Sequence, residues 1–417
     1  MSVAKVKIKK FNNINIYELG YFFICFFLYT PGGLKNYSEL LNTLIKWGLF
    51  LFCLFYITKS IIKKKYSFST HNGQMLFGIM LLYFGAVNIY LAPSRIVSEL
   101  ATFFLPAVGV RLLIQQKELM ESYFWNALVF YSKMMLLLNF LSTIIFPRGI
   151  YISASGATYD RANWLFGSRN NMAVYIILFF VIVYLDDLYK KRIINRQSKF
   201  SMKLFVYIFL SMFPVLMCGD NGIGFFEGSS TGIISVSFLC VVCLFLEVID
   251  ASKSRLLNQL FDPKIMFVIV IFISIIVILG NFNSNVIAMI TGIFGKNSTF
   301  TGRTYVWTSA INYILKSPVI GYGEVDIVLR RLSFTDVTYV YSGILRILLS
   351  YGIVGIGLFA LYVLKPFFTL KNGIYQKACA CGLCGFFIVG MMNEFEYIFI
   401  FTLVFIATSV RKEKVSI

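Results

Sequence analysis

The polar segment at residues 301–323 contains the residue types that are best suited to chemistry. Arg303 lies at the predicted start of a helix, and apolar residues, Trp307 among them, then recur at helical spacing. The start of a helix offers free backbone N–H groups, and the guanidinium of arginine adds a planar fork of donors that fits a phosphate. The segment therefore predicts a site for an anion. A structural ion pair between Arg303 and a carboxylate of the same loop is the alternative.

Two polar loops, at residues 147–170 and 282–342, contain most of the arginines that lie outside the lysine-rich clusters, together with several carboxylates. A connection as long as the second loop is usually functional or disordered. The helical spacing of apolar residues in this second loop favours a folded loop with an interfacial helix near 304–317. The candidates for catalysis or binding are Asp160, Arg161 and Arg169 in the first loop and Glu324, Arg330, Arg331 and Asp336 in the second.

The composition indicates an all-α, polytopic membrane protein. Hydrophobic residues make up 58% of the 417 residues and charged residues 14%, whereas a soluble domain carries about 25% charged residues. We predict about twelve transmembrane helices in a single integral membrane domain, residues 1–417. Glu99 and Lys133 fall inside predicted spans, where an ionisable residue is either functional or paired with a neighbouring helix. The expected spans are 15–30, 40–58, 73–92, 94–114, 122–146, 171–188, 204–218, 229–249, 265–281, 343–364, 376–392 and 395–410.

The lysines and arginines predict the orientation of these helices. An N-terminus in the cytoplasm places 25 of the 38 basic residues on the cytoplasmic side, as the positive-inside rule requires. The even number of spans returns the C-terminus to the cytoplasm, and both polar loops then face outward, the larger one between the ninth and tenth spans. The net charge of +19 thus favours contact with anionic membrane lipids. It does not indicate nucleic acid as a partner, because no soluble basic domain is present to hold it.

The kind of basic residue differs between the two sides. The cytoplasmic set holds 20 lysines and 5 arginines, whereas the other basic residues are 5 lysines and 8 arginines. A lysine suffices as a point charge for topology, but arginine presents donors that match a phosphate. The excess of arginine over lysine outside the cytoplasmic set therefore predicts that at least two outward arginines contact a phosphate or an acidic sugar. Arginines that cap helix ends are the alternative.

Several short motifs lie between residues 165 and 365. The strongest follows the pattern G-R-x-x-x-W … P-x-x-G-x-G and consists of Gly302, Arg303, Trp307, Pro318, Gly321 and Gly323. The weaker ones are Arg169-Asn170-Asn171, Ser229-Ser230-Thr231-Gly232, and Tyr341-Ser342 followed by Gly352 and Gly355. Together these motifs resemble those of the O-antigen ligase/polymerase family of bacterial membrane glycan enzymes.

The resemblance implies an enzyme of the bacterial plasma membrane. Members of the family join glycans that are carried on undecaprenyl pyrophosphate, with the lipid pyrophosphate as leaving group and with no metal, cofactor or nucleotide sugar. The implied product is O-antigen or capsular polysaccharide. The lipid-linked glycan and the membrane lipids are the implied partners, and a chain-length regulator and a flippase are further candidates.

The resemblance also assigns roles to residues and shows two departures. Arg303 becomes a pyrophosphate contact, while Asn171 and Trp307 are expected at the substrate. Ser230 stands where the family has an arginine, and Tyr341 stands near the histidine of the ligases. These departures favour a repeat-unit polymerase over a ligase.

Other residues must then supply the missing groups. We expect Arg169 to replace the arginine that is absent at Ser230, and Arg161 to contact the acceptor sugar. The single histidine, His71, falls in a predicted cytoplasmic loop and cannot serve as the ligase histidine. The carboxylates that could act as a base, if the reaction uses one, are Asp160, Glu324, Asp326 and Asp336.

A lipid-linked oligosaccharide flippase or transporter is the alternative from a different functional class. Such a protein needs charged residues along a path through the helical bundle, and its helices are often interrupted near mid-membrane. This chain instead gathers its polar residues in two loops on one side. The distribution favours chemistry at the outer surface.

Overall fold

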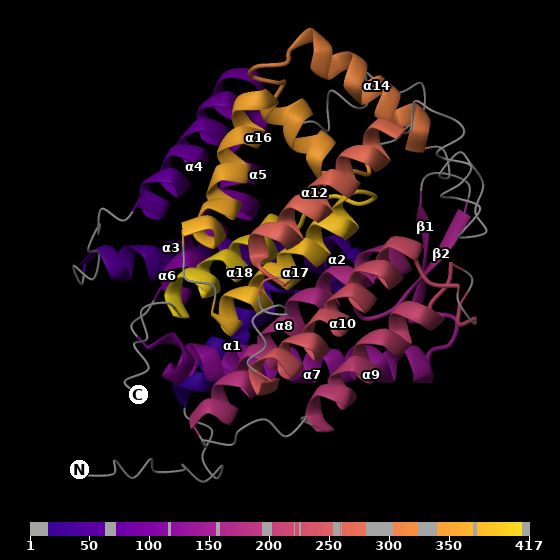
Figure 1. The fold of residues 1–417 in the computed structure, drawn as a ribbon. Coiled ribbons are helices and arrows are strands. Elements are labelled where there is room, and N and C mark those ends of the chain that lie inside the picture. Colours follow the sequence, from indigo (N-terminus) through magenta and orange to yellow (C-terminus); the bar gives the residue numbers. More distant parts are fainter. Residues whose placement is uncertain are drawn as a thin grey trace.

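The computed structural model describes residues 16–62, 72–115, 118–155, 159–193, 202–220, 222–224, 227–252, 259, 261–280, 303–323, 340–369 and 373–410. These residues form a bundle of helices with one small two-stranded sheet (Figure 1). The first half contains α1 (Ile16–Leu28), α2 (Gly32–Tyr37), α3 (Glu39–Ile62), α4 (Asn72–Leu91), η1 (Pro93–Arg95), α5 (Ile96–Glu99), η2 (Leu100–Phe104), α6 (Leu105–Ile114), η3 (Leu119–Glu121), α7 (Tyr123–Ile145), β1 (Tyr151–Ser155), β2 (Tyr159–Asn163) and α8 (Arg169–Ile193). The second half contains α9 (Met202–Met217), α10 (Ser230–Ser252), α12 (Pro263–Gly280), α14 (Arg303–Lys316), α16 (Gly343–Thr369), α17 (Ile374–Gly390) and α18 (Tyr397–Ser409).

Helical structure is found at each of the twelve expected positions, with ends that differ by a few residues. By length and composition, six helices of the described ranges could cross a membrane, and six further apolar helices have 10–17 residues. The chain is therefore an all-α, multi-pass membrane protein. The count of twelve spans and their orientation stay predictions.

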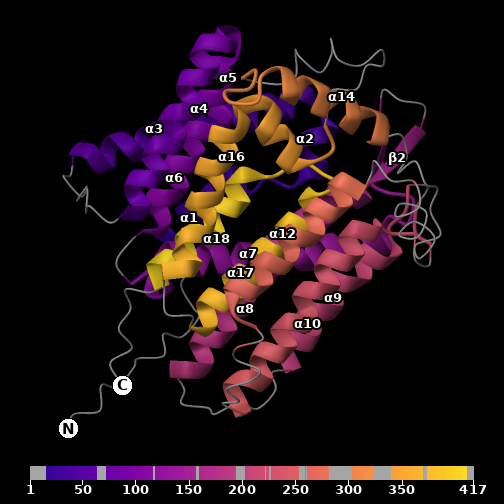
Figure 2. The same ribbon diagram turned by 45° about the horizontal axis from the view of Figure 1, so that its top comes forward.

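The centre of the bundle is α8. It packs against α7, α9, α10 and α17, and its residues from Met172 to Leu185 are all buried. By contrast, α3, α4 and α12 expose large apolar side chains such as Leu40, Leu82 and Phe272. Exposed apolar faces of this kind suit contact with lipid. The α14 helix and the β1–β2 hairpin both lie at one end of the bundle (Figures 1 and 2).

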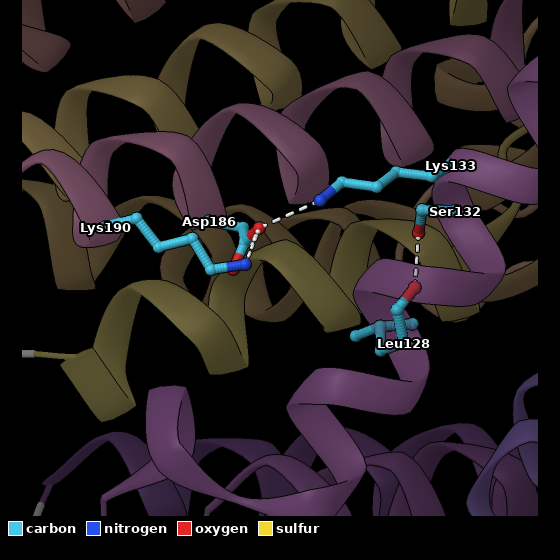
Figure 3. A network of polar contacts seen from close by, with 5 residues as sticks. All are labelled: Leu128, Ser132, Lys133, Asp186 and Lys190. Atoms are coloured by element: carbon cyan, nitrogen blue, oxygen red, sulfur yellow. Dashed lines mark hydrogen bonds and ion pairs between the residues drawn. The ribbon is translucent and has the colours of Figure 1, made fainter. Parts of the chain in front are cut away.

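A network of charged residues connects the core helices α7 and α8, away from α14 and the β1–β2 hairpin. Asp186 of α8 is nearly buried, and its Oδ2 accepts from Lys133 Nζ of α7 at 3.1 Å and from Lys190 Nζ at 2.9 Å (Figure 3). A buried carboxylate is tolerated only when such partners compensate its desolvation. Lys133, which lies inside a predicted span, is therefore paired with a neighbouring helix.

A break in α16 forms a second structural feature, beside the segment that follows α14. Gly352 has φ +63° and ψ −165°, a conformation that essentially only glycine adopts. Residues 318–323, which we call the clamp segment, lie against the break. The backbone hydrogen bonds between them are Tyr322 N–H to Leu349 O (2.9 Å), Gly323 N–H to Ser350 O (2.8 Å) and Ile353 N–H to Pro318 O (2.8 Å).

The glycines of the clamp segment allow this close contact. Gly321 and Gly323 both have positive φ, and a Cβ on Gly321 would lie 2.6 Å from the carbonyl carbon of Ser350. The Pro-x-x-Gly-x-Gly part of the motif therefore serves backbone packing against α16. That packing orients the first half of α16, which carries Arg346, Ser350 and Tyr351.

The predicted orientation can be tested by labelling single introduced cysteines. All eight native cysteines are buried, so they contribute little background to the labelling of intact cells. A cysteine at position 195 should react with a membrane-impermeant maleimide only after the cells are opened. A cysteine at position 290 should react in intact cells. Labelling of position 195 from outside would contradict the whole assignment of sides.

Candidate functional site

A cavity of about 550 Å³ lies at the end of the bundle that carries the hairpin. Elements far apart in the sequence form its walls: α2, α5, β2, the start of α8, the first half of α16 and the connection between α17 and α18. Its charged side chains are those of Lys35, Arg161 and Arg346 and of Glu99, Glu394 and Glu396. Its asparagines are Asn36, Asn163, Asn170, Asn171 and Asn393. Cations, carboxylates and amides thus share one cavity.

The hairpin brings Arg161 to this cavity. Tyr151 pairs with Asn163 and Ser153 with Arg161 in antiparallel register. Residues two apart on a strand point to the same face, which accounts for the presence of both Arg161 and Asn163 in the cavity wall. The Tyr151 hydroxyl donates to Gly33 O of α2 at 2.8 Å. Burial raises the pKa of Tyr151 to about 12, so this donor stays protonated at neutral pH.

The connection between α17 and α18 is hydrogen-bonded to the start of α8. Asn393 Nδ2 lies 3.2 Å from Asn170 O and 3.3 Å from Asn171 Oδ1. These hydrogen bonds fix the start of α8 beside the cavity. Asn171, predicted to bind substrate, therefore lies in the cavity wall.

A series of hydrogen bonds joins α14 to the cavity. The Trp307 side chain is 1% exposed, and its Nε1 donates to Val340 O at 2.9 Å. Val340 N–H donates to Glu394 Oε1 at 3.3 Å, and Glu394 Oε2 accepts from Arg346 Nη1. Trp307 thus lies in a packed core and is absent from the cavity lining.

Tyr341 follows Val340 directly and lines the cavity. Its φ of +55° is rare for a residue other than glycine and costs about 1–2 kcal/mol. Strained backbone of this kind occurs often at functional sites. Tyr341 also stands near the position of the ligase histidine in the family pattern, and its catalytic role stays a prediction.

Arg169 is held outside the cavity lining. Its Nη2 lies 2.6 Å from Asp220 Oδ2, and its Nη1 donates to Glu227 O at 2.9 Å. Glu227 belongs to the segment just before Ser230, where α10 begins. Arg169 therefore lies close to the position of the missing family arginine, but its charge is matched by a carboxylate.

The remaining predicted residues are only partly described. Arg303 begins α14 and Asp160 lies in β2, as backbone positions whose side chains are outside the described part. The residues outside the described ranges altogether are Glu324, Asp326, Arg330, Arg331 and Asp336. Four residues of the cavity lining were not predicted individually as site residues: Lys35, Arg346, Glu394 and Glu396. Arg346 is, however, one of the eight arginines of which at least two were expected to contact a phosphate or an acidic sugar. The available signal was Asn393-Glu394, the polar break between the last two predicted spans.

The family model that matches this chain falls on its second half. Residues 215–360 match the family model described as O-antigen ligase. A stretch of 95 residues is 32% identical to the exopolysaccharide production protein ExoQ of Rhizobium meliloti (strain 1021). That match covers 23% of this chain and 20% of the relative, so the chain spans about a fifth of the relative's length. No solved structure matches the chain. The resemblance predicted from the motifs is confirmed: residues 215–360 of this chain are similar to an O-antigen ligase/polymerase-like family.

Proposed function

We propose that this chain is a membrane glycosyltransferase that polymerises undecaprenyl-pyrophosphate-linked oligosaccharide repeat units. The reaction takes place at the outer face of the bacterial plasma membrane and yields O-antigen or capsular polysaccharide. The observation that supports this most strongly is the cavity in which Arg161, Arg346 and Lys35 lie with three carboxylates and five asparagines. Cations suit the pyrophosphate, and amides suit the hydroxyl groups of sugars.

The proposed reaction is a transfer of a glycan between two lipid carriers. A hydroxyl oxygen of the acceptor sugar forms a bond to the anomeric carbon of the donor. The bond from that carbon to the pyrophosphate oxygen breaks and leaves its electron pair on the undecaprenyl pyrophosphate. The hydroxyl proton passes to a base and then to solvent. Neither a metal nor a nucleotide sugar is required in this scheme.

A carboxylate is the base that we propose for this step. Among the described residues that line the cavity there are three glutamates and no histidine. Glu394 is engaged by Arg346. Glu99 ends α5 and directly precedes the π-helical turn η2. Turns of this kind are frequent at functional sites. Glu99 therefore joins Asp160, Glu324, Asp326 and Asp336 as a candidate base.

O-antigen ligase is the second candidate function, because the matching family model carries that description. A ligase transfers a finished polymer, whereas a polymerase extends it. The lack of a histidine in the described cavity lining favours the polymerase.

The glycans of a strain that lacks this chain distinguish the candidates. We expect surface glycan with a single repeat unit per acceptor, because export continues without polymerisation. Long polymer that stays on the lipid carrier would instead indicate a ligase. A complete absence of exported repeat units would indicate a flippase and would contradict the proposal. Re-expression of the wild-type chain is the control.

A further inference from the structure

Arg346 and Glu394 form an ion pair in the wall of the cavity. Their side chains are 23% and 17% exposed, and Arg346 Nη1 donates to Glu394 Oε2. Removing both charges from water is costly, and such pairs often contribute little or nothing to stability. The position of the pair in the cavity is therefore better explained by a ligand than by the fold.

The surroundings of Glu394 point to a role in placing Arg346. Besides its contact with the guanidinium, the carboxylate accepts from Val340 N–H, whose carbonyl in turn accepts from Trp307. Glu394 thus fixes Arg346 relative to α14, the helix that begins at Arg303. The clamp segment fixes the same half of α16 through its backbone hydrogen bonds.

The chemistry of the ligand follows from the charges that share the cavity with Arg346. A pyrophosphate leaving group develops negative charge on several oxygens, more than one guanidinium can stabilise. A guanidinium presents five N–H donors in a planar fork, which suits contact with several phosphate oxygens at once. Arg161 lines the same cavity, while Arg169 is bound to Asp220 outside the lining.

We propose that Arg346 binds the pyrophosphate of the lipid-linked donor and that Glu394 is the positioning residue that aims its guanidinium. This assignment rests on the proposed function. In this assignment the second arginine of the site, besides Arg303, is Arg346 of α16. It is not Arg169 at the start of α8.

Binding of inorganic pyrophosphate to the purified full-length protein tests the first part. Arg346→Gln should weaken the affinity for pyrophosphate roughly 10- to 100-fold, because a charge-assisted contact is lost. Arg346→Lys should recover only part of the loss, since lysine lacks the planar fork. Arg148→Gln, which alters an exposed arginine outside the cavity lining, is the matched control and should bind as the wild type does. Equal affinity in Arg346→Gln and the wild type would overturn the assignment, as would a wild type that binds no pyrophosphate.

The positioning role predicts opposite effects on binding and turnover. Glu394→Gln removes a negative charge that competes with the ligand, so the affinity for pyrophosphate should be kept or raised. Turnover should nevertheless fall roughly 10-fold, because the guanidinium is no longer held in the geometry of the transition state. A merely structural role would lower both quantities together, and either that result or unchanged turnover would overturn this part.

Failure of the inference is distinct from failure of the proposed function. The proposed function fails if the deletion strain still makes long polymer, whatever the binding data show. The inference fails if the affinity for pyrophosphate does not depend on Arg346, even where the deletion strain lacks polymer. Weaker binding in Arg346→Gln together with wild-type polymer length would show that the anion bound there is not the donor, and would also overturn it.

Discussion

Gly352→Ala should prevent most of the protein from accumulating in a folded state. The glycine has φ +63°, and an added Cβ would lie 2.2 Å from Val319 O of the clamp segment. The strained backbone and the steric overlap together should destabilise the protein by roughly 2–5 kcal/mol. The measurement is the abundance and the thermal unfolding of the detergent-solubilised protein, followed by fluorescence-detected gel filtration.

The matched control for this prediction lies in the same helix. A Cβ on Gly357 would meet nothing within 4 Å, so Gly357→Ala should leave abundance and unfolding temperature unchanged or slightly improved. If Gly352→Ala behaves like Gly357→Ala, the contact between the clamp segment and α16 does not hold this region together. The explanation of the Gly-x-Gly motif as a packing element would then be wrong.

Arg303→Ala should abolish long-chain glycan while leaving the amount of protein near normal. The loss of one charge-assisted phosphate contact costs about 1.5–3 kcal/mol, or roughly a 10- to 100-fold decrease in rate when the contact is made mainly in the transition state. Arg303→Lys should restore little polymer, since the planar fork of donors is lost. The measurement is the length distribution of the surface glycan in cells whose only copy carries the substitution.

Two further variants show whether this effect is specific to Arg303. Arg148→Ala changes an exposed arginine outside the cavity lining and should leave the length distribution unchanged. Trp307→Phe keeps most of the packing against α16 but loses the hydrogen bond to Val340 O, so a modest shortening of the polymer is expected. Full-length polymer from Arg303→Ala would remove this arginine from the mechanism.

The apolar helices could be predicted from the sequence because each depends on a local property. A stretch such as 229–249 is apolar over a length that can cross a bilayer, and α10 lies there. The hairpin could not be predicted in the same way. Arg161 lies in a short polar stretch whose strand pairing depends on contacts with Gly33 and Asp220, which are distant in the sequence.

The cavity was harder to predict because its residues meet only through tertiary packing. Glu394 and Arg346 lie 48 positions apart, one in the connection after α17 and the other in the first turn of α16. The sequence around such a charged residue is the same whether its side chain caps a helix or faces a ligand. Tyr341 was found because a motif marked it, and Glu99 because it interrupts an apolar stretch.

The enclosure of α8 has a consequence for how the protein responds to its bilayer. A membrane that is thicker or thinner than the apolar length of a helix makes that helix tilt, or deforms the lipid around it. Such a force acts on helices whose side chains meet lipid, and α3, α4 and α12 have apolar faces for this contact. The side chains of α8 from Met172 to Leu185 are in contact with protein instead. Changes in bilayer thickness should therefore be taken up at the periphery, while Asn171 keeps its place in the cavity wall.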